Sequence, residues 1–248
     1  MKRYGLIGFP LSHSFSLKYF SEKFDREGLR EAVYQNFEIK DIDDLPSLLE
    51  TYPDLLGLNV TIPYKEQVKK YVDALDHSAE KVGAVNVIKI LPDRKKIGYN
   101  SDYYGFRTSL EHWLGTTVSS IKALVLGSGG ASKAVQVVLD DCNIAFDIVS
   151  RNKGKGNYDY YDLIEAPEII ENHKLIINTS PLGMYPHVNE APHLPYEVLG
   201  KDHFLYDLIY NPAVTLFLKK GKDHEANVKN GLEMLELQAE KSWEIWNE

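Results

Sequence analysis

The sequence has little cysteine, no excess of positive charge and no long apolar stretch, and each absence excludes a class of protein. One cysteine, Cys142, stands among 248 residues, which excludes an internal disulfide framework and leads us to expect a cytoplasmic protein. No apolar run approaches the roughly 18 residues that a membrane-spanning helix needs, so we expect no membrane partner. The opening segment, MKRYGLIGFPLSHS, has an apolar run interrupted by glycine and proline, which does not suit a secretory signal.

The charge and the histidine content narrow the ligand classes further. The formal net charge of −8 argues against nonspecific nucleic-acid binding, so an anionic ligand must meet cationic groups concentrated at its site. The 8 histidines are scattered along the chain and lack the spacing of a zinc site, so we expect no bound metal. With 44% hydrophobic and 26% charged residues, the composition is that of a globular protein with one large domain or two ordinary ones.

The most informative stretch is KALVLGSGGASKAVQVVL, at 122–139. Its apolar run at 123–126 predicts a buried strand, a glycine turn occupies 127–130, and apolar residues return at helical spacing from Ala131. Strand, glycine turn and helix open a dinucleotide-binding βαβ unit, in which the backbone approaches a pyrophosphate at the helix N-terminus. The third glycine position of this fingerprint holds Ser132, so a structural turn in another α/β protein stays an alternative.

A basic turn follows the next predicted strand, at 145–149. It consists of Ser150, Arg151 and Asn152, with two lysines close behind. An NAD site usually has an acidic residue here to bind the ribose 2′-hydroxyl, whereas an arginine suits the 2′-phosphate of NADP. We therefore predict NADP as the cofactor, with a solvated basic turn as the alternative.

Residues 1–100 read as an α/β unit in which strands alternate with helices, a pattern typical of a mostly parallel sheet. We predict strands at 3–7, 33–39, 56–60, 84–90 and 96–100, and helices ending near 27 and at 43–51 and 66–75, with a further turn near 79. Asp43 or Asp44 is expected to cap the helix at 43–51.

The rest of the chain predicts a second α/β unit, entered through a helix at 103–114. Further buried strands are expected at 175–178 and 204–208, and the polar segment 153–161 is expected to be a flexible loop. An amphipathic helix at 230–246 follows with no strand left to pair.

Nicotinamide chemistry needs a proton donor or acceptor beside the carbon that exchanges hydride. Lys65 follows a predicted strand and Asp102 lies at a strand-to-helix junction, where parallel α/β sheets bind ligands. Taken singly, they are better read as a surface lysine and a helix-capping aspartate. The pair Tyr19 and Lys23 matches a short-chain dehydrogenase motif, but it lies about a hundred residues upstream of the glycine turn, and we interpret it as a chance match.

Taken together, eight motifs in the right order resemble the shikimate dehydrogenase family, and the resemblance covers essentially the whole chain. The motifs are Gly8-Phe9-Pro10-Leu11-Ser12-His13-Ser14-Phe15-Ser16, Asn59-Val60-Thr61-Ile62-Pro63-Tyr64-Lys65, Gly83-Ala84-Val85-Asn86, Asn100-Ser101-Asp102-Tyr103-Tyr104-Gly105, Gly127-Ser128-Gly129-Gly130-Ala131, Asn178-Thr179-Ser180-Pro181-Leu182-Gly183-Met184, Asp207-Leu208-Ile209-Tyr210-Asn211-Pro212 and Gly231-Leu232-Glu233-Met234-Leu235-Glu236-Leu237-Gln238. The chain departs from the usual pattern at 17–20, at Val87 and at Ser101, where the last change keeps a hydroxyl.

The resemblance implies reversible reduction of 3-dehydroshikimate by NADPH, which gives shikimate for aromatic amino-acid biosynthesis. It implies that Lys65 is the acid/base and is paired with Asp102. Ser14 and Ser16 would bind the substrate carboxylate, with Tyr210 nearby. The residues implied to hydrogen-bond the ring hydroxyls are Asn59, Thr61, Asn86, Asp102 and Gln238.

The resemblance also implies a cofactor site and a domain plan. The implied cofactor contacts are Gly127, Ser128, Gly129, Gly130, Ala131, Ser150, Arg151, Asn152, Thr179, Met184, Leu208 and Gly231. A substrate-binding and catalytic domain is expected at 1–101 and a Rossmann-type NADP-binding domain at 102–229. The C-terminal helix, at 230–248, would return to the substrate domain and bring Gln238 to the site.

Two alternative functions remain open. A quinate/shikimate dehydrogenase of wider substrate range would differ by only a few side chains, although Arg151 favours NADP and the biosynthetic enzyme. A catalytically silent NADP-binding sensor or scaffold could share the fold, but it would not need both Lys65 and Asp102. A monomer and a homodimer are equally compatible with the sequence.

Overall fold

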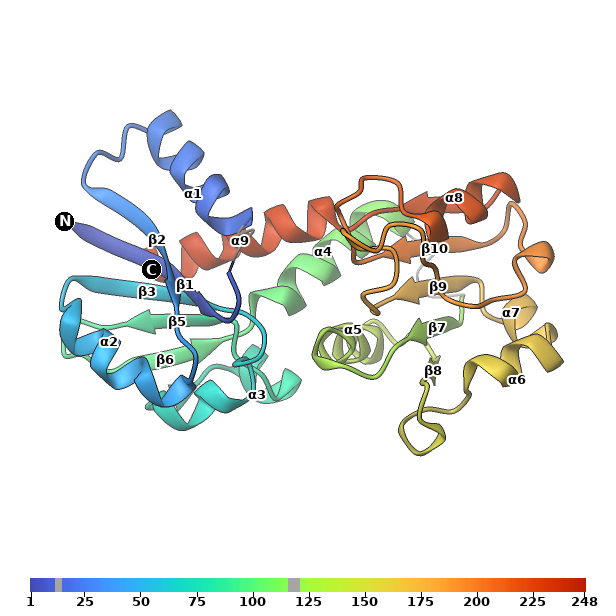
Figure 1. Ribbon diagram of the computed structural model, residues 1–248, viewed down its shortest axis with the longest axis horizontal. Coiled ribbons are helices and arrows are strands. Elements are labelled where there is room, and N and C mark those ends of the chain that lie inside the picture. Colours follow the sequence, from blue (N-terminus) through green and yellow to red (C-terminus); the bar gives the residue numbers. More distant parts are fainter. Residues whose placement is uncertain (12–14, 116–120) are drawn as a thin grey trace. The chain divides into compact units, whose positions relative to one another are not determined.

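The computed structural model describes residues 1–11, 15–115 and 121–248. The chain forms two compact units: unit 1 contains Met1–Tyr104 and Gln238–Glu248, and unit 2 contains Gly105–Leu237. The divisions fall within two long helices, α4 at Ser101–Leu114 and α9 at Leu232–Asn247 (Figure 1). Both units are α/β, which confirms the predicted fold class.

Unit 1 is built on a six-stranded sheet of order β2-β1-β3-β5-β6-β4. Its strands are β1 Lys2–Gly8, β2 Ala32–Glu38, β3 Leu55–Val60, β4 Ala74–Leu75, β5 Val87–Ile90 and β6 Lys96–Tyr99. β1 runs parallel to β2 and β3, while β5 runs antiparallel to both β3 and β6. The carboxyl ends of β1, β3 and β6 and the start of β5 therefore lie at one edge of the sheet.

The sheet is mostly parallel, as predicted, and the antiparallel β5 is the exception among its strands. The turn that follows β5 is closed by backbone hydrogen bonds from Arg94 to Leu91 and from Leu91 to Lys95. A connection this short can join only antiparallel strands, because a parallel pair needs a crossover of a dozen or more residues. Arg94 has a φ of 69° in this turn and donates side-chain hydrogen bonds to the backbone carbonyls of Pro53 and Leu55.

Helices cover both faces of the unit 1 sheet. They are α1 Phe15–Arg26, α2 Leu45–Thr51 and α3 His77–Val82, with short 3₁₀ helices η1 Ile42–Asp44 and η2 Gln67–Tyr71. α1 and the end of α9 pack on one face, where Phe20 and Phe24 meet Trp246 and its neighbours in a buried aromatic cluster. The opposite face is covered by residues of α2, η2 and α3.

Two local predictions in unit 1 were wrong. The segment predicted as a helix at 66–75 is η2 followed by β4, because the open edge of β6 pairs with β4 and draws the chain into the sheet. The expected cap is also displaced, since Asp41 accepts from the backbone N–H of Asp43 at the start of η1. Asp44 stands at the N-cap of α2 without a side-chain hydrogen bond.

Unit 2 is built on a five-stranded sheet of order β11-β10-β9-β7-β8 in which all pairings are parallel. Its strands are β7 Ala123–Leu126, β8 Phe146–Val149, β9 Leu175–Asn178, β10 Phe204–Asp207 and β11 Asn227–Lys229. β7 and β9 are completely buried, as is typical of central parallel strands with both faces covered. The four strands predicted for this unit are present.

Further helices flank the unit 2 sheet. They are α5 Gly130–Asp141, α6 Tyr160–Glu165, α7 Glu168–Asn172 and α8 Leu216–Asp223, with 3₁₀ helices η4 Lys153–Lys155 and η5 Tyr196–Val198. α6, α7, α8 and β11 were not predicted, since each is short or lacks a clear apolar period. The segment 153–161, which was predicted to be a flexible loop, contains η4. It is held against β8 by Asn157, whose Oδ1 accepts a hydrogen bond from the backbone N–H of Ile148. No helix in the described residues is long and apolar enough to cross a membrane.

Candidate active site

One edge of the unit 1 sheet gathers most of the predicted substrate residues. Asn59 lies at the end of β3, with Thr61 and Lys65 just beyond it, and Asn86 immediately precedes β5. Asp102 lies in the first turn of α4, which follows β6. Since β5 is antiparallel, its start lies beside the carboxyl ends of β3 and β6, and this reversal brings Asn86 to the same edge.

Lys65 and Asp102 form a direct pair. The Nζ atom of Lys65 lies 2.7 Å from Oδ2 of Asp102, and the two side chains are 28% and 19% exposed. A lysine ammonium has three N–H donors, so it can hold Asp102 and still donate to a ligand. Partial exposure leaves the pair accessible to a small molecule, and a positioned lysine and carboxylate are suited to general acid/base chemistry.

Asn59 is held in one orientation by a buried network. Its Oδ1 accepts from the hydroxyl of Tyr34 on β2 at 2.8 Å, and its Nδ2 lies 2.9 Å from Oγ of Ser242 and 3.4 Å from the carbonyl oxygen of Asn86. Both amide hydrogens are therefore committed. Oδ1 has a second lone pair, so toward a ligand Asn59 would act as an acceptor.

Asn86 has the complementary arrangement. Its Oδ1 accepts from the backbone N–H of Ser101 at 2.7 Å, and its Nδ2 donates to Oγ of Ser101 at 3.1 Å. Ser101 in turn donates to Oε1 of Gln238 at 3.3 Å and lies 3.2 Å from the hydroxyl of Ser242. These contacts link the start of α4 to α9 and leave a second amide hydrogen on Asn86 that could serve a ligand hydroxyl.

The structure describes only some of the residues that were predicted to bind the substrate carboxylate. Ser16 lies in the first turn of α1 and is half-buried. Ser14 lies outside the described residues. Tyr210 belongs to unit 2, where burial raises the pKa of its phenol. Its predicted place beside the serines therefore stays a prediction.

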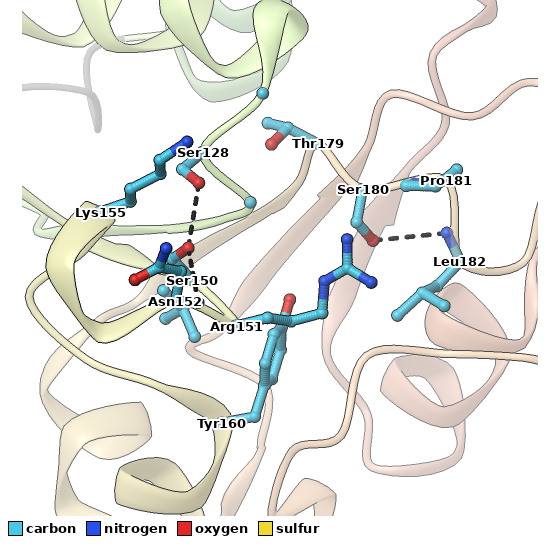
Figure 2. Close-up of a pocket in the computed structure, with 13 residues that line it drawn as sticks. Ser128, Ser150, Arg151, Asn152, Lys155, Tyr160, Thr179, Ser180, Pro181 and Leu182 are labelled. Carbon is cyan, nitrogen blue, oxygen red and sulfur yellow. Dashed lines mark hydrogen bonds between the residues drawn. The ribbon is translucent and has the colours of Figure 1, made fainter.

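Unit 2 contains a cavity of about 660 Å³ at the carboxyl ends of β7, β8 and β9 (Figure 2). Its lining residues are Gly127, Ser128, Gly129, Val149, Ser150, Arg151, Asn152, Lys155, Tyr160, Thr179, Ser180, Pro181 and Leu182. The hydroxyls of Ser128 and Ser150 lie 3.0 Å apart and connect the glycine turn to the basic turn across neighbouring strands. The cavity thus brings together seven of the predicted cofactor residues.

The glycines of the turn meet two different requirements: one avoids a steric clash, and the others leave open space over the backbone. Gly127 has a φ of 117°, and a Cβ atom there would lie 2.7 Å from Oγ1 of Thr179. Gly129 and Gly130 have no heavy atom within 4 Å of such a position, so space is open over the turn. Gly129 is the N-cap of α5 and makes no side-chain cap. The exposed first N–H groups and the helix dipole are therefore suited to a phosphate.

Two cationic side chains, Arg151 and Lys155, line the cavity. Arg151 extends beside Tyr160 toward Ser180, and Lys155 lies across from it near Ser128 (Figure 2). The lining contains no acidic residue, and within the described ranges no ion pair involves Arg151. Burial raises the pKa of the Tyr160 phenol, which the charge of Arg151 opposes. The donor set suits an anionic group.

The buried carboxyl of Asp207 holds the loop after β9 in place through hydrogen bonds. Oδ1 of Asp207 accepts from Nδ2 of Asn178 at 3.0 Å, and Oδ2 accepts from Thr215 at 2.6 Å. Asn178 then accepts from the hydroxyl of Ser180 at 2.6 Å. Burial raises the pKa of Asp207 to about 6 although these hydrogen bonds lower it. The chain of contacts fixes the start of the segment that lines the cavity.

Five predicted cofactor residues do not line this cavity. Gly130 and Ala131 begin α5 just behind the turn. Met184 is 48% exposed in the loop after β9. Leu208 follows β10 and packs against Gly231, where an added Cβ would lie 2.0 Å from the carbonyl oxygen of Leu208. These residues belong to unit 2, and their predicted role stays a prediction.

Several residues of these two sites were missed from the sequence. Tyr34 and Ser242 support Asn59 from β2 and α9, and no local pattern connects positions so far apart in the chain. Tyr160 enters the cavity from the start of α6. Ser180 lies in the segment after β9, and its place at the carboxyl end of a buried strand could have identified it.

No group of three or more metal-ligating residues occurs in the parts of the chain that the structure describes.

Comparison with known proteins places these observations in a family. The chain matches a model of the shikimate dehydrogenase substrate binding domain at residues 6–88. It is 43% identical over 255 residues to shikimate dehydrogenase (NADP(+)) of Clostridium beijerinckii, with 100% of this chain and 93% of the relative covered. It is 38% identical over 259 residues to the enzyme of the same name from Methanococcus aeolicus, with 99% and 91% covered.

A solved structure agrees with these sequence relatives. Shikimate 5-dehydrogenase from Thermus thermophilus, in complex with NADP(H) and shikimate, matches with a TM-score of 0.83 at 27% identity, covering 99% of this chain and 93% of that chain. The similarity thus extends over both units and over the order of their elements. The chain belongs to the shikimate dehydrogenase family.

Proposed function

We propose that this chain catalyses the reversible, NADP-linked interconversion of 3-dehydroshikimate and shikimate in aromatic amino-acid biosynthesis, with Lys65 as the acid/base. Membership of the family makes the chain an NADP-dependent oxidoreductase. The single observation that supports the residue assignment is the 2.7 Å contact between Lys65 and Asp102 at the ligand-binding edge of the unit 1 sheet.

Unit 1 would hold the substrate. Ser14 and Ser16 bind its carboxylate through their hydroxyls, and Tyr210 contributes from unit 2. The ring hydroxyls contact Asn59, Thr61, Asn86, Asp102 and Gln238. The hydrogen-bond networks support opposite roles for the two asparagines, since Asn59 has an acceptor to offer and Asn86 a donor.

Lys65 would move the proton. In the direction of ketone reduction, its Nζ donates to the carbonyl oxygen as negative charge develops there, and in the reverse direction it accepts the hydroxyl proton. Asp102 orients the Nζ and stabilises its positive charge. When bound, the cofactor would supply hydride as NADPH in ketone reduction and accept it as NADP⁺ in the reverse reaction. The remaining residues of unit 1 fix the substrate ring so that the reacting oxygen lies within reach of Lys65.

Unit 2 would hold NADP in the 660 Å³ cavity. The glycine turn and the first N–H groups of α5 bind the pyrophosphate, with Gly127, Ser128, Gly129, Gly130 and Ala131. Ser150, Arg151 and Asn152 bind the 2′-phosphate together with Lys155. Thr179, Met184, Leu208 and Gly231 line the nicotinamide end. This assignment is supported by the open space over Gly129 and Gly130 and by the two cations, Arg151 and Lys155, that line the cavity.

The same residues also bear on the substrate range and on whether the chain is catalytically active. Arg151 favours NADP and the biosynthetic reaction over a quinate/shikimate enzyme. The Lys65–Asp102 pair argues against a silent NADP-binding sensor or scaffold, because such a protein has no use for it. We infer a cytoplasmic protein that acts as a monomer or a homodimer.

The test is a steady-state assay of nicotinamide absorbance with shikimate or quinate as substrate and NADP or NAD as cofactor. The wild type should be active chiefly with shikimate and NADP. Lys65→Ala should lose activity by at least about a hundredfold while its circular dichroism stays unchanged. Comparable activity with quinate or NAD would move the chain to the broader group. Inactivity with every pair would refute the proposal.

A further inference from the structure

Tyr34 hydrogen-bonds to a residue that the proposed function assigns to the substrate. It lies on β2, is 4% exposed and stacks on Phe20 with ring centroids 4.6 Å apart. Its hydroxyl lies 2.8 Å from Oδ1 of Asn59. We propose that Tyr34 is a positioning residue for substrate binding, which orients Asn59 for a ring hydroxyl. This inference rests on the proposed function.

The direction of each hydrogen bond follows from what each atom can do. Nδ2 of Asn59 donates to the carbonyl oxygen of Asn86, which can only accept, so the other end of the amide is its oxygen. An amide oxygen also only accepts, so Tyr34 gives its single hydroxyl hydrogen to Asn59.

This arrangement prepares Asn59 for the substrate. Its oxygen is held in place, so a ring hydroxyl can donate to the second lone pair without an amide rotation. When the substrate binds, Tyr34 keeps its own donor on Asn59.

Tyr34 remains a neutral phenol. Burial raises the pKa of its hydroxyl strongly. The hydroxyl therefore remains a donor over the whole range in which the enzyme would work. Tyr34 does not reach the reacting atoms, so its effect should fall on substrate binding rather than on turnover.

The neighbouring strand provides a matched control. Tyr4 on β1 is in register with Tyr34, is 1% exposed and belongs to the same aromatic cluster. Its ring stacks on Trp246 with centroids 4.9 Å apart. Within the described part of the chain its hydroxyl makes no hydrogen bond, so Tyr4→Phe removes a buried hydroxyl from the same core without touching Asn59.

The experiment compares Tyr34→Phe with Tyr4→Phe in the full-length protein. We expect Tyr34→Phe to raise the KM for shikimate about tenfold, the effect of one lost hydrogen bond, with kcat and the KM for NADP changed less than about twofold. Calorimetric titration with shikimate alone should show the same loss of affinity. Tyr4→Phe should leave all of these values unchanged. In an Asn59→Ala background, Tyr34→Phe should add less, because its effect passes through Asn59.

Two outcomes would overturn the inference. Equal constants for Tyr34→Phe and Tyr4→Phe would show that the hydroxyl has no positioning role. A fall in kcat and in Tm together, with KM unchanged, would assign Tyr34 a structural role instead. The proposed function is tested separately by the wild type, which must turn over shikimate. A wild type that neither binds nor oxidises shikimate would refute both.

Discussion

Nζ of Lys65 and Oδ2 of Asp102 lie 2.7 Å apart, although the two residues are 37 positions apart in the chain. Lys65 follows β3 and Asp102 follows β6, and the antiparallel β5 between these strands makes their carboxyl ends point the same way. The pair is therefore a product of sheet topology.

Replacing the carboxylate should reduce turnover. Asp102→Asn keeps the shape of the side chain but removes the charge that orients and stabilises the lysine ammonium, so we expect kcat for shikimate oxidation to fall about a hundredfold. The exposed pair of Lys70 and Asp43 has a similar separation of 2.8 Å and provides the control. Asp43→Asn should retain full activity, and an Asp102→Asn enzyme as fast as this control would contradict the assigned role.

Arg151 should determine the choice between NADP and NAD. Arg151→Ala removes a charged donor from a cavity that contains no acidic side chain. We expect the KM for NADP to rise about 10- to 100-fold, as loss of a charged hydrogen bond implies, while the KM for NAD stays nearly constant. Arg107→Ala removes an arginine that pairs with Glu111 on α4 and should change neither value. An equal rise for both cofactors would mean that Arg151 does not read the 2′-phosphate.

The buried Asp207 should make stability depend on pH. Its pKa is raised to about 6 in the folded chain, so the native state binds its proton more tightly than the unfolded state does. Its stabilising contribution is complete below the unfolded pKa of about 4 and is lost as the pH rises through about 6, by up to about 3 kcal/mol.

Asp207→Asn tests this dependence, because an uncharged amide has no such proton. Urea unfolding from about pH 4 to about pH 7 should show the variant gaining stability relative to the wild type as the pH rises. The comparison of slopes is independent of any constant cost of the substitution. Parallel pH profiles for the two proteins would show that Asp207 is not the group responsible.

Gly57 should not tolerate a side chain. It lies in β3 beneath Trp246, where an added Cβ would come within 2.2 Å of the indole Nε1, and that indole donates to the carbonyl of Ile88 at 3.0 Å. Gly57→Ala should reduce the free energy of unfolding by about 1–3 kcal/mol, as overpacking does. Gly200→Ala meets no atom within 4 Å and should cost much less. Similar losses in the two variants would argue against this contact.

Short-range patterns carried most of the fold prediction. The glycine turn after 123–126 predicted β7 and α5 because only such a sequence places unsubstituted backbone at the start of a helix. The segment at 66–75 failed because its apolar residues suit a helix and a buried edge strand equally, and the open edge of β6 decided between them. β11 escaped notice because a strand of three residues leaves little periodicity.

The sequence by itself determined the family, the two α/β units and the residue types at each site, because motif spacing and apolar period are local properties of the chain. Only the tertiary structure decided which of those residues meet. The reversal of β5 brings Asn86 beside Asn59, and the packing of α9 against β3 places Ser242 on the same amide. Tyr34 reaches that amide from β2. Such contacts depend on strand order and helix packing, which no local pattern encodes.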